Sequence, residues 1–326
     1  MDTEVVAAGS GLFGSRRGSA PDKVFKGAAL GAALLVLVIL GAIVLSTSNK
    51  AWPIFSKEGL GYFTGRFFDD TNKSYGLWAY LYGTIVVSAV AVVFAVPTSI
   101  GIALFTTELA PRRVRFWITT VVDLLASIPS VVFGLWGLLV LAPRLDGAYS
   151  GIHDLVGSVP VLGTIFGPPS GGGRTFMTAG LIVALMITPI ITSITREVFN
   201  TVPGNDKDGA LALGATRWEM IKGVVLPHSN GGIVGAVMLG LGRAMGETIA
   251  IALLIGASPQ VVGNLFASGE AMPAAIVRFL PEAPSGSDFQ AALIGLGVVL
   301  FILTVVVNMA ARGIVARIDR RLQGAA

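Results

Sequence analysis

The sequence contains no cysteine, only two histidines and few charged residues. Without cysteine, the chain forms no disulfide and has no thiolate to act as a nucleophile or a metal ligand. Charged residues make up 13% of the 326 residues, about half of the usual 25% or so in soluble domains, and the mean hydropathy is +0.78. So few polar side chains cannot cover a water-soluble protein of this length, and the composition predicts an integral membrane protein.

The chain also lacks any Gly-Lys dipeptide and therefore any P-loop, so the glycine run 171–173 is not a phosphate cradle of that type. The two histidines are far apart in the sequence, which argues against a metal site. We expect no cofactor and no metal in this chain. The net charge of +4 does not indicate a nucleic-acid partner, because the basic residues lie in short segments beside apolar stretches.

Six apolar segments are long enough to cross a bilayer, which takes about 20 residues. Four of them contain no charged residue, the third contains only Asp123, and the fifth contains only Arg243 and Glu247. The sequence therefore predicts an all-α integral membrane protein with one membrane domain, 27–311. Its six transmembrane helices are expected at about 27–46, 77–105, 116–142, 175–195, 230–258 and 289–311.

The basic residues predict the orientation of these spans. Fifteen Lys and Arg residues lie in the tails and in two connecting segments on one side, and seven lie on the other side. Cytoplasmic segments carry the excess of positive charge. We therefore expect the cytoplasmic side to hold the N-terminal tail 1–26, the loop 106–115, the loop 196–229 and the C-terminal tail 312–326.

The loop 196–229 is the longest connection and has signals for two short helices. Residues 207–213 are compatible with a helix, and Thr216 with Glu219 is typical of a capping box that opens a second helix at 217–225. Pro227 is expected to end that helix before the fifth span. Two interpretations remain open: apolar side chains anchor the hairpin in a partner's groove, or the hairpin lies on the bilayer surface. Those side chains are Leu213, Trp218, Met220 and Ile221.

The spacing of this loop resembles the coupling motif of ATP-binding-cassette importer permeases: Glu-Ala-Ala, three residues, Gly, nine residues, Ile-any-Leu-Pro. The sequence departs from it with Asp208 for Glu, Gly209 for Ala and Val224 for Ile. Gly209 weakens the helix by about 0.5–1 kcal/mol relative to Ala. The resemblance implies that the loop seats in a separate ATPase subunit. The residues expected there are Asp208, Gly209, Ala210, Leu213, Gly214, Arg217, Trp218, Glu219, Met220, Ile221, Leu226 and Pro227.

Three further segments, 127–135, 212–219 and 242–248, are similar to the phosphate-specific (Pst) importer permeases, and the layout is closer to their C-type than to their A-type. The likeness extends over about residues 20–320. It implies a type I importer permease in the bacterial cytoplasmic (inner) membrane that moves phosphate and hydrolyses nothing itself. The implied partners are a paralogous permease, two cytoplasmic ATPase subunits that bind ATP and Mg, an external phosphate-binding protein and membrane lipid.

Arg243 and Glu247 lie near the middle of the fifth span, where each charge costs about 2.5–3.5 kcal/mol. Their spacing of four predicts that both lie on one helix face and compensate each other. We expect Arg243 to line the translocation path and bind phosphate oxygens, with Glu247 limiting the affinity. A salt bridge that fixes packing between permease chains remains the alternative. Asp123 is either a path residue or a partner of a basic residue at a helix end.

Three other functions remain open from the sequence. The same machine could carry another oxyanion, molybdate or sulfate. An ion-gradient-driven transporter or channel is a second possibility, although the spans lack a relay of acidic residues and histidines. A scaffold that senses phosphate through the ATPase without carrying flux is the third.

Overall fold

The computed structural model describes residues 20–66, 68–69 and 73–323, with side chains described between Lys23 and Gly313. The expected N-terminal tail therefore lies mostly outside the described residues. The chain divides into two compact units, residues 1–49 and 50–326. The first helix, α1 (Ala20–Glu58), begins in the first unit and ends in the second. In the first unit its apolar side chains are exposed, as suits a helix surrounded by lipid.

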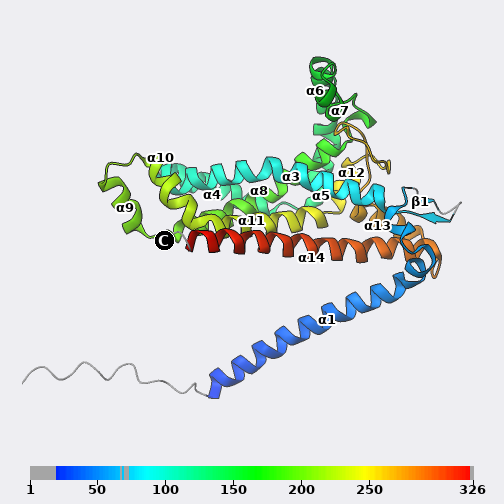
Figure 1. Ribbon diagram of the computed structural model, residues 1–326, viewed down its shortest axis with the longest axis horizontal. Helices are drawn as coiled ribbons and strands as arrows, with labels where there is room; N and C mark the ends of the chain where they lie inside the picture. Colours follow the sequence, from blue (N-terminus) through cyan, green and yellow to red (C-terminus); the bar gives the residue numbers. More distant parts are fainter. Residues whose placement is uncertain (1–19, 67, 70–72, 324–326) are drawn as a thin grey trace, which may run out of the picture. The chain divides into compact units, whose positions relative to one another are not determined.

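The second unit is a bundle of five helices that run side by side: α3, α4, α8, α11 and α14 (Figure 1). The central helix is α8, which packs against α3, α4 and α11, while α14 packs against α11. A Cβ added to Gly180 of α8 would lie 2.4 Å from Val90 Cγ1 of α3, so only glycine allows this close approach of the two helices. The bounds are α3 Trp78–Leu104, α4 Arg112–Ser127, α8 Phe176–Asn200, α11 Leu226–Gly246 and α14 Asp288–Gln323.

Six helical runs are long and apolar enough to cross a membrane. This number agrees with the sequence prediction, and the first, second, fourth and sixth runs overlap the expected spans. Two runs differ, and both differences have a physical cause in the chain. The runs are Lys23–Glu58, Trp78–Leu109, Ser130–Val156, Gly171–Asn200, Arg217–Gly246 and Asp288–Gly313.

The expected third span, 116–142, is not one continuous helix. Helix α4 ends at Ser127, and a new helix, α5 (Ser130–Trp136), begins after Ile128 and Pro129, which are both extended. Proline cannot donate a helical hydrogen bond and forces the preceding residue out of the helical region, so Pro129 breaks the span. After α5 the chain continues through a π-helical turn, η2 (Gly137–Leu141), into α6 (Ala142–Val156).

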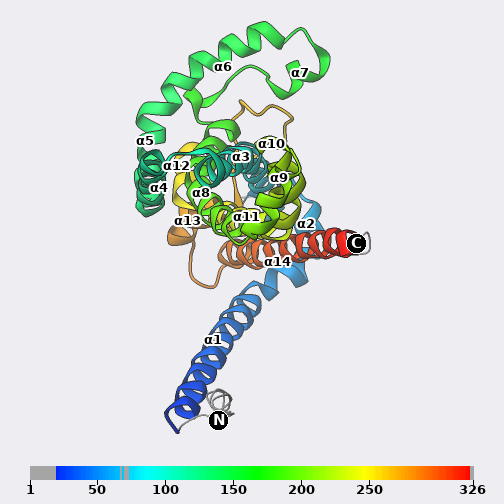
Figure 2. The same ribbon diagram turned by 90° about the vertical axis from the view of Figure 1, so that its left-hand side faces the viewer.

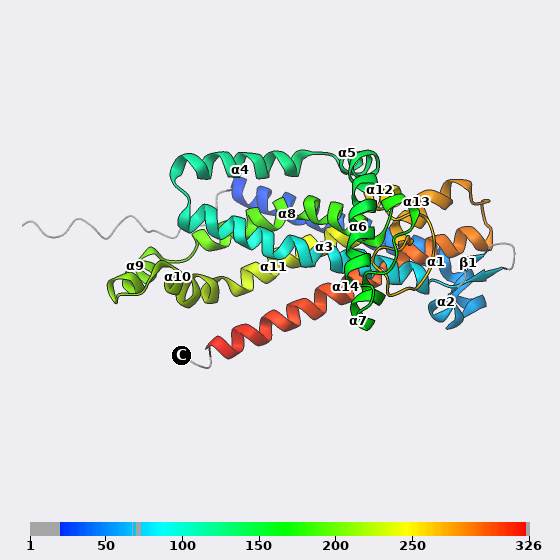
Figure 3. The same cartoon turned by 90° about the horizontal axis from the view of Figure 1, so that it is seen from above.

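Figure 2 shows that helix α6 turns away from the bundle axis, and α7 (Pro160–Ile165) follows it at the same end of the bundle (Figure 1). The end of α1, the hairpin of β1 and β2, and α13 pack there around Tyr62, Tyr75 and Leu77. Figure 3 shows α9 and α10 at the opposite end of the bundle from this group. The remaining elements at the α6 end are α2 Gly61–Thr64, β1 Phe68–Asp69, β2 Ser74–Tyr75, η3 Gly171–Gly173, α12 Ile249–Leu254, α13 Met272–Phe279 and η5 Leu280–Glu282.

Candidate functional site

The fifth run stops earlier than the sequence predicts, and this changes the geometry of its two charged residues. Helix α11 ends at Gly246, Glu247 has extended backbone angles, and a separate helix, α12, starts at Ile249. The expected single helix over 230–258 is therefore wrong. Glu247 Oε1 accepts a hydrogen bond from the backbone N–H of Ala250 at 3.2 Å. This carboxylate is therefore the acceptor for one of the N–H groups at the start of α12 that have no partner within the helix.

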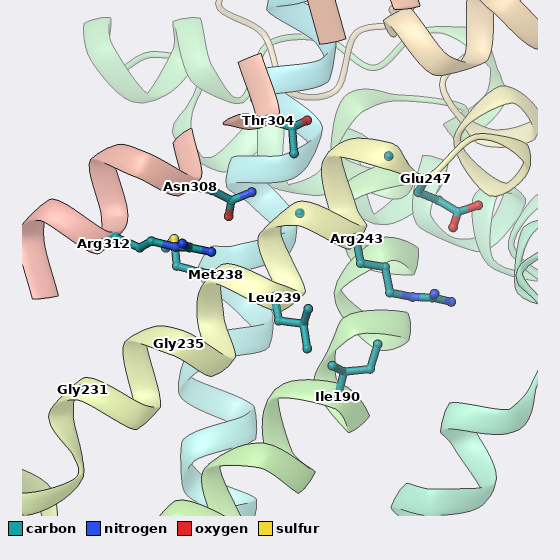
Figure 4. A pocket seen from close by; sticks show the side chains of 12 residues that line it. Ile190, Gly231, Gly235, Met238, Leu239, Arg243, Glu247, Thr304, Asn308 and Arg312 are labelled. Carbon is teal, nitrogen blue, oxygen red and sulfur yellow. The ribbon is translucent and has the colours of Figure 1, made fainter. Parts of the chain in front are cut away.

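Arg243 and Glu247 do not form the expected pair. Among the described residues, no ion pair or hydrogen bond joins them, because Glu247 has left the helix on which a spacing of four would bring them together. The Arg243 side chain is exposed and Glu247 is largely buried. In Figure 4 both side chains project to the same side of α11 without pointing at each other. The guanidinium is thus free to bind another acceptor.

Both residues line an open cavity of about 1030 Å³ that runs along α11, with Ile190 of α8 and three residues of α14 in its walls (Figure 4). On the α11 side, Gly235, Gly242 and Gly246 leave open space, since an added Cβ at each would meet no atom within 4 Å. Missing side chains along this wall make room for a small solute next to the guanidinium. The lining residues are Ile190, Gly231, Gly235, Met238, Leu239, Gly242, Arg243, Gly246, Glu247, Thr304, Asn308 and Arg312.

Three lining residues on α14 were not expected at the site: Thr304, Asn308 and Arg312. In the sequence, Arg312 counts only among the basic residues of the tail 312–326 that predict the orientation of the spans. A signal was present, because the three are spaced by four residues in an otherwise apolar stretch and so share one helix face.

Asp123, the remaining candidate path residue, is exposed on α4 and does not line this cavity. The structure therefore brings Arg243 and Glu247 to one cavity, but not Asp123. No feature of the described chain links Asp123 to the other two residues, and its role stays a prediction.

The hairpin after α8 forms as the sequence predicts at its turn. Helix α9 (Gly204–Ala212) is followed by α10 (Arg217–Met220), and the capping box is present in both directions between Thr216 and Glu219. Gly214 lies between the helices with a φ of +89°. The backbone N–H of Gly214 donates to Leu211, and that of Ala215 donates to Ala210, which closes α9 with a Schellman motif.

The four apolar side chains of the hairpin divide into two pairs. Leu213 and Trp218 are 91% and 60% exposed, so they are free to contact a partner. Met220 and Ile221 are buried against Phe199 and other side chains of the bundle, so the expectation that they reach a partner is wrong. The helical repeat turns positions 220 and 221 inward when 218 faces outward. Of the other residues expected there, Asp208, Gly209, Gly214, Arg217 and Glu219 are exposed, and Ala210, Leu226 and Pro227 are half-buried.

Pro227 does not end the second helix of the hairpin, as the sequence suggested. Helix α10 passes through a π-helical turn, η4 (Ile221–Val225), into α11, which begins at Leu226. Pro227 lies in the first turn of α11, where its missing N–H matters less. The wider π-turn changes the hydrogen-bond register ahead of the proline, so the helix continues without a break.

An ion pair ties the hairpin to the bundle. Lys207 Nζ of α9 lies 2.6 Å from Glu108 Oε1, in a π-helical turn, η1 (Phe105–Leu109), at the end of α3. The Glu108 side chain is only 8% exposed. Sequence reasoning missed this contact, because 99 residues separate the two partners and only the folded chain brings them together.

A second ion pair lies at the other end of the bundle and was also missed. Arg278 of α13 donates to Glu270 and, through Nη2, to the carbonyl of Ala252 in α12 at 2.7 Å. Glu270 is almost fully buried, and its burial raises the pKa of the carboxyl to about 7 even though Arg278 acts in the opposite direction. The pair holds α12 and α13 together immediately after the break at Glu247.

Known proteins are similar to this chain over most of its length. Residues 95–324 match the model of the family described as "Binding-protein-dependent transport system inner membrane component". The "Phosphate transport system permease protein PstC" of Mesorhizobium japonicum is 41% identical over 94% of this chain and 93% of its own length. The protein of the same name from Haemophilus influenzae is 39% identical over 88% and 91%. A chain of a bacterial alginate ABC transporter, solved with an alginate-bound periplasmic protein, is 17% identical, with a TM-score of 0.59 over 91% of this chain and 97% of its own.

Proposed function

This chain belongs to the family of binding-protein-dependent transport system inner membrane components. On that premise, we propose that it is the channel-forming membrane subunit of an importer of inorganic phosphate, and that ATP-binding-cassette subunits drive this importer. The relatives named as phosphate transport permeases match it almost end to end. The six apolar runs agree with a multi-pass protein of the bacterial inner membrane. The excess of basic residues favours a cytoplasmic position for both tails, the α9–α10 hairpin and the inner ends of α11 and α14.

The observation that carries the choice of an anion as the substrate is the free guanidinium of Arg243. It lies in a cavity among apolar helices and has no partner among the described side chains. A buried or membrane-embedded charge of this kind is costly unless an opposite charge meets it during the functional cycle. The guanidinium has five N–H donors in a planar fork, which suits the oxygens of a tetrahedral oxyanion.

Glu247 opposes tight binding in this proposal. Its carboxylate faces the same cavity and holds the start of α12 through Ala250. A negative charge close to the anion lowers the affinity by electrostatic repulsion. A translocation path needs this balance, because a solute that binds too tightly is not released.

The α9–α10 hairpin is the proposed contact with an ATPase subunit. Leu213 and Trp218 are its large exposed apolar side chains, and α9 and α10 lie at the end of the bundle that the basic residues place in the cytoplasm (Figure 3). Aromatic anchors of this kind dominate the energetics of protein interfaces. The capping box and the Lys207–Glu108 pair hold the hairpin in one position, so a displacement of the ATPase is passed to the bundle.

The chain supplies no nucleotide chemistry in this assembly. ATP and Mg bind to two cytoplasmic ATPase subunits, a paralogous permease completes the pathway, and an external phosphate-binding protein delivers the substrate. Helices α6 and α7 turn away from the bundle at the outer end and offer a surface for that delivery protein.

The test compares Arg243→Gln with Arg243→Lys in the assembled transporter. We expect the Gln variant to lose phosphate uptake by about tenfold or more, since about 1.4 kcal/mol of lost interaction gives a factor of ten, and the Lys variant to keep part of it. Arg113→Gln, an exposed arginine at the start of α4 outside the cavity, is the matched control and should keep normal uptake. Normal uptake by a correctly assembled Arg243→Gln transporter would refute the proposed role.

Competition among phosphate, molybdate and sulfate in the same uptake assay tests the substrate. Phosphate should compete most strongly for wild-type uptake. Stronger competition by molybdate or sulfate would assign the machine to that oxyanion. Uptake that persists without the ATPase subunits would instead indicate a transporter driven by an ion gradient.

A further inference from the structure

One face of α14 is polar, and it lines the cavity. Thr304, Asn308 and Arg312 follow one another at intervals of four residues and are all part of the cavity wall. The apolar residues between them, among them Val305, Val306 and Met309, are exposed away from it. Side chains four residues apart stack on one helix face, so the polar stripe follows the cavity for two turns, about 12 Å.

Two of these three side chains have hydrogen-bond donors available for a solute. The hydroxyl of Thr304 donates to the carbonyl of Leu300 at 2.8 Å, so its donor is already used within the helix. Asn308 and Arg312 have no hydrogen-bond partner among the described residues. The Arg312 guanidinium presents only donors, and the Asn308 amide can add its NH₂ group, so the two side chains together suit a ligand rich in acceptors.

Figure 4 shows that Arg312 extends from α14 towards Met238 on the opposite wall. An arginine at the inner end of a span often reaches lipid headgroups, but this side chain lies along the cavity with Asn308 beside it. Opposite it, Gly235 leaves space that no side chain fills. The site therefore combines a positive charge, an amide and room for a small molecule.

We propose that Arg312 and Asn308 form a second anion-binding site, on the cytoplasmic side of Arg243, which receives a tetrahedral oxyanion from Arg243 before release. The proposal rests on the proposed function for the direction of passage. Met238, at the level of Arg312, precedes Arg243 by five residues of α11, or about 7.5 Å of helix rise. An anion can thus leave one guanidinium and meet the next within the same cavity, and neither site has to bind it strongly.

The absence of cysteine allows a direct test of binding at this level. Gly235→Cys places one thiol on the wall opposite Arg312, where an added Cβ meets no atom within 4 Å. Gly223→Cys is the matched control: it lies in the same helical run, has the same open space and does not line the cavity. Each variant is studied in the assembled transporter in nanodiscs made of zwitterionic phosphatidylcholine, with and without inorganic phosphate.

We expect phosphate to slow the reaction of the Gly235→Cys variant with a negatively charged methanethiosulfonate reagent by about tenfold, equivalent to about 1.4 kcal/mol, and to leave the reaction of Gly223→Cys unchanged. Adding Arg312→Gln to Gly235→Cys should remove the protection and reduce the preference of the thiol for the negative over the positive reagent. Arg312→Lys should keep that preference. Phosphate uptake should fall by about tenfold in Arg312→Gln, with the complex still assembled.

Lack of protection by phosphate in a transporter that takes up phosphate normally would overturn this proposal and leave the proposed function intact. Protection that occurs only when anionic lipid is added to the nanodiscs would also overturn it, because the site would then hold a lipid headgroup. If Arg243→Gln retains uptake while the thiol of Gly235→Cys remains protected, the second site stands and the role of Arg243 is the part that fails.

Discussion

The turn between α9 and α10 provides a sharp test of how this sequence builds the hairpin that we propose contacts an ATPase, because one methyl group added at two nearby glycines should have opposite effects. Gly214 has a φ of +89° and closes α9, whereas Gly209 lies inside α9 with ordinary helical geometry. An added Cβ meets no atom within 4 Å at either position. Packing is therefore the same for both substitutions, and the backbone alone decides the result.

The two effects follow from the backbone angles. Alanine at position 214 must adopt a left-handed conformation, which costs about 1–2 kcal/mol for a residue with a Cβ. Alanine at position 209 removes a helix-weakening glycine and stabilises α9 by about 0.5–1 kcal/mol. The difference between the variants is then about 2 kcal/mol, which corresponds to a factor of about 30 in a local opening equilibrium.

Amide hydrogen exchange over residues 204–220 in the purified transporter measures this equilibrium. Gly214→Ala should speed exchange in this segment, and Gly209→Ala should slow it. Gly147→Ala in α6, where an added Cβ also meets nothing within 4 Å, is the control and should leave the segment unchanged. Equal exchange in Gly214→Ala and the wild type would show that the hairpin does not depend on the left-handed residue.

Two further predictions concern the ion pairs. Lys207→Gln should destabilise the packing of α9 on η1 by about 1.5–3 kcal/mol, the usual value of a hydrogen bond to a charged group, because it leaves the nearly buried Glu108 without its partner. Amide hydrogen exchange in α9 should become faster, and the charge swap Lys207→Glu with Glu108→Lys should restore part of the protection. Unchanged exchange in Lys207→Gln would contradict this prediction. The pKa of Glu270, raised from 4.5 to about 7 by burial, means that the folded state holds the proton more tightly, so wild-type stability should fall as the pH rises through this interval. The melting temperature relative to Glu270→Gln should fall with it, and a difference independent of pH would refute the assignment.

The parts of the molecule that depend on neighbouring residues could be predicted from the sequence. The capping box of Thr216 and Glu219 needs only three residues of separation, and it forms as expected. The six apolar runs also follow from composition alone, since a span is defined by its length and its lack of charge. The break at Pro129 also has a signal in the sequence, the proline itself, but the apolar stretch continues on both sides of it and predicts one span at 116–142.

The end of α11 could not be predicted in the same way. Gly246, Glu247 and Thr248 contain no proline, and the apolar pattern continues on both sides of them. The chain leaves the helix here because Glu247 bonds to the next helix and the Glu270–Arg278 pair holds that helix in place. The pairs Lys207–Glu108 and Glu270–Arg278 likewise depend on the packing of separate helices, which a single sequence does not display.

The uninterrupted helical run from Arg217 to Gly246 gives the molecule a rigid lever about 45 Å long. Trp218 lies at one end of this lever and Arg243 near the other, so one helix joins the exposed indole to the cavity. The lever ends at Gly246, because Glu247 has extended backbone angles. In the proposed transporter, a displacement delivered at Trp218 would therefore reach Arg243 along one continuous helix, while Arg278 anchors the segment beyond Glu247 to the carbonyl of Ala252.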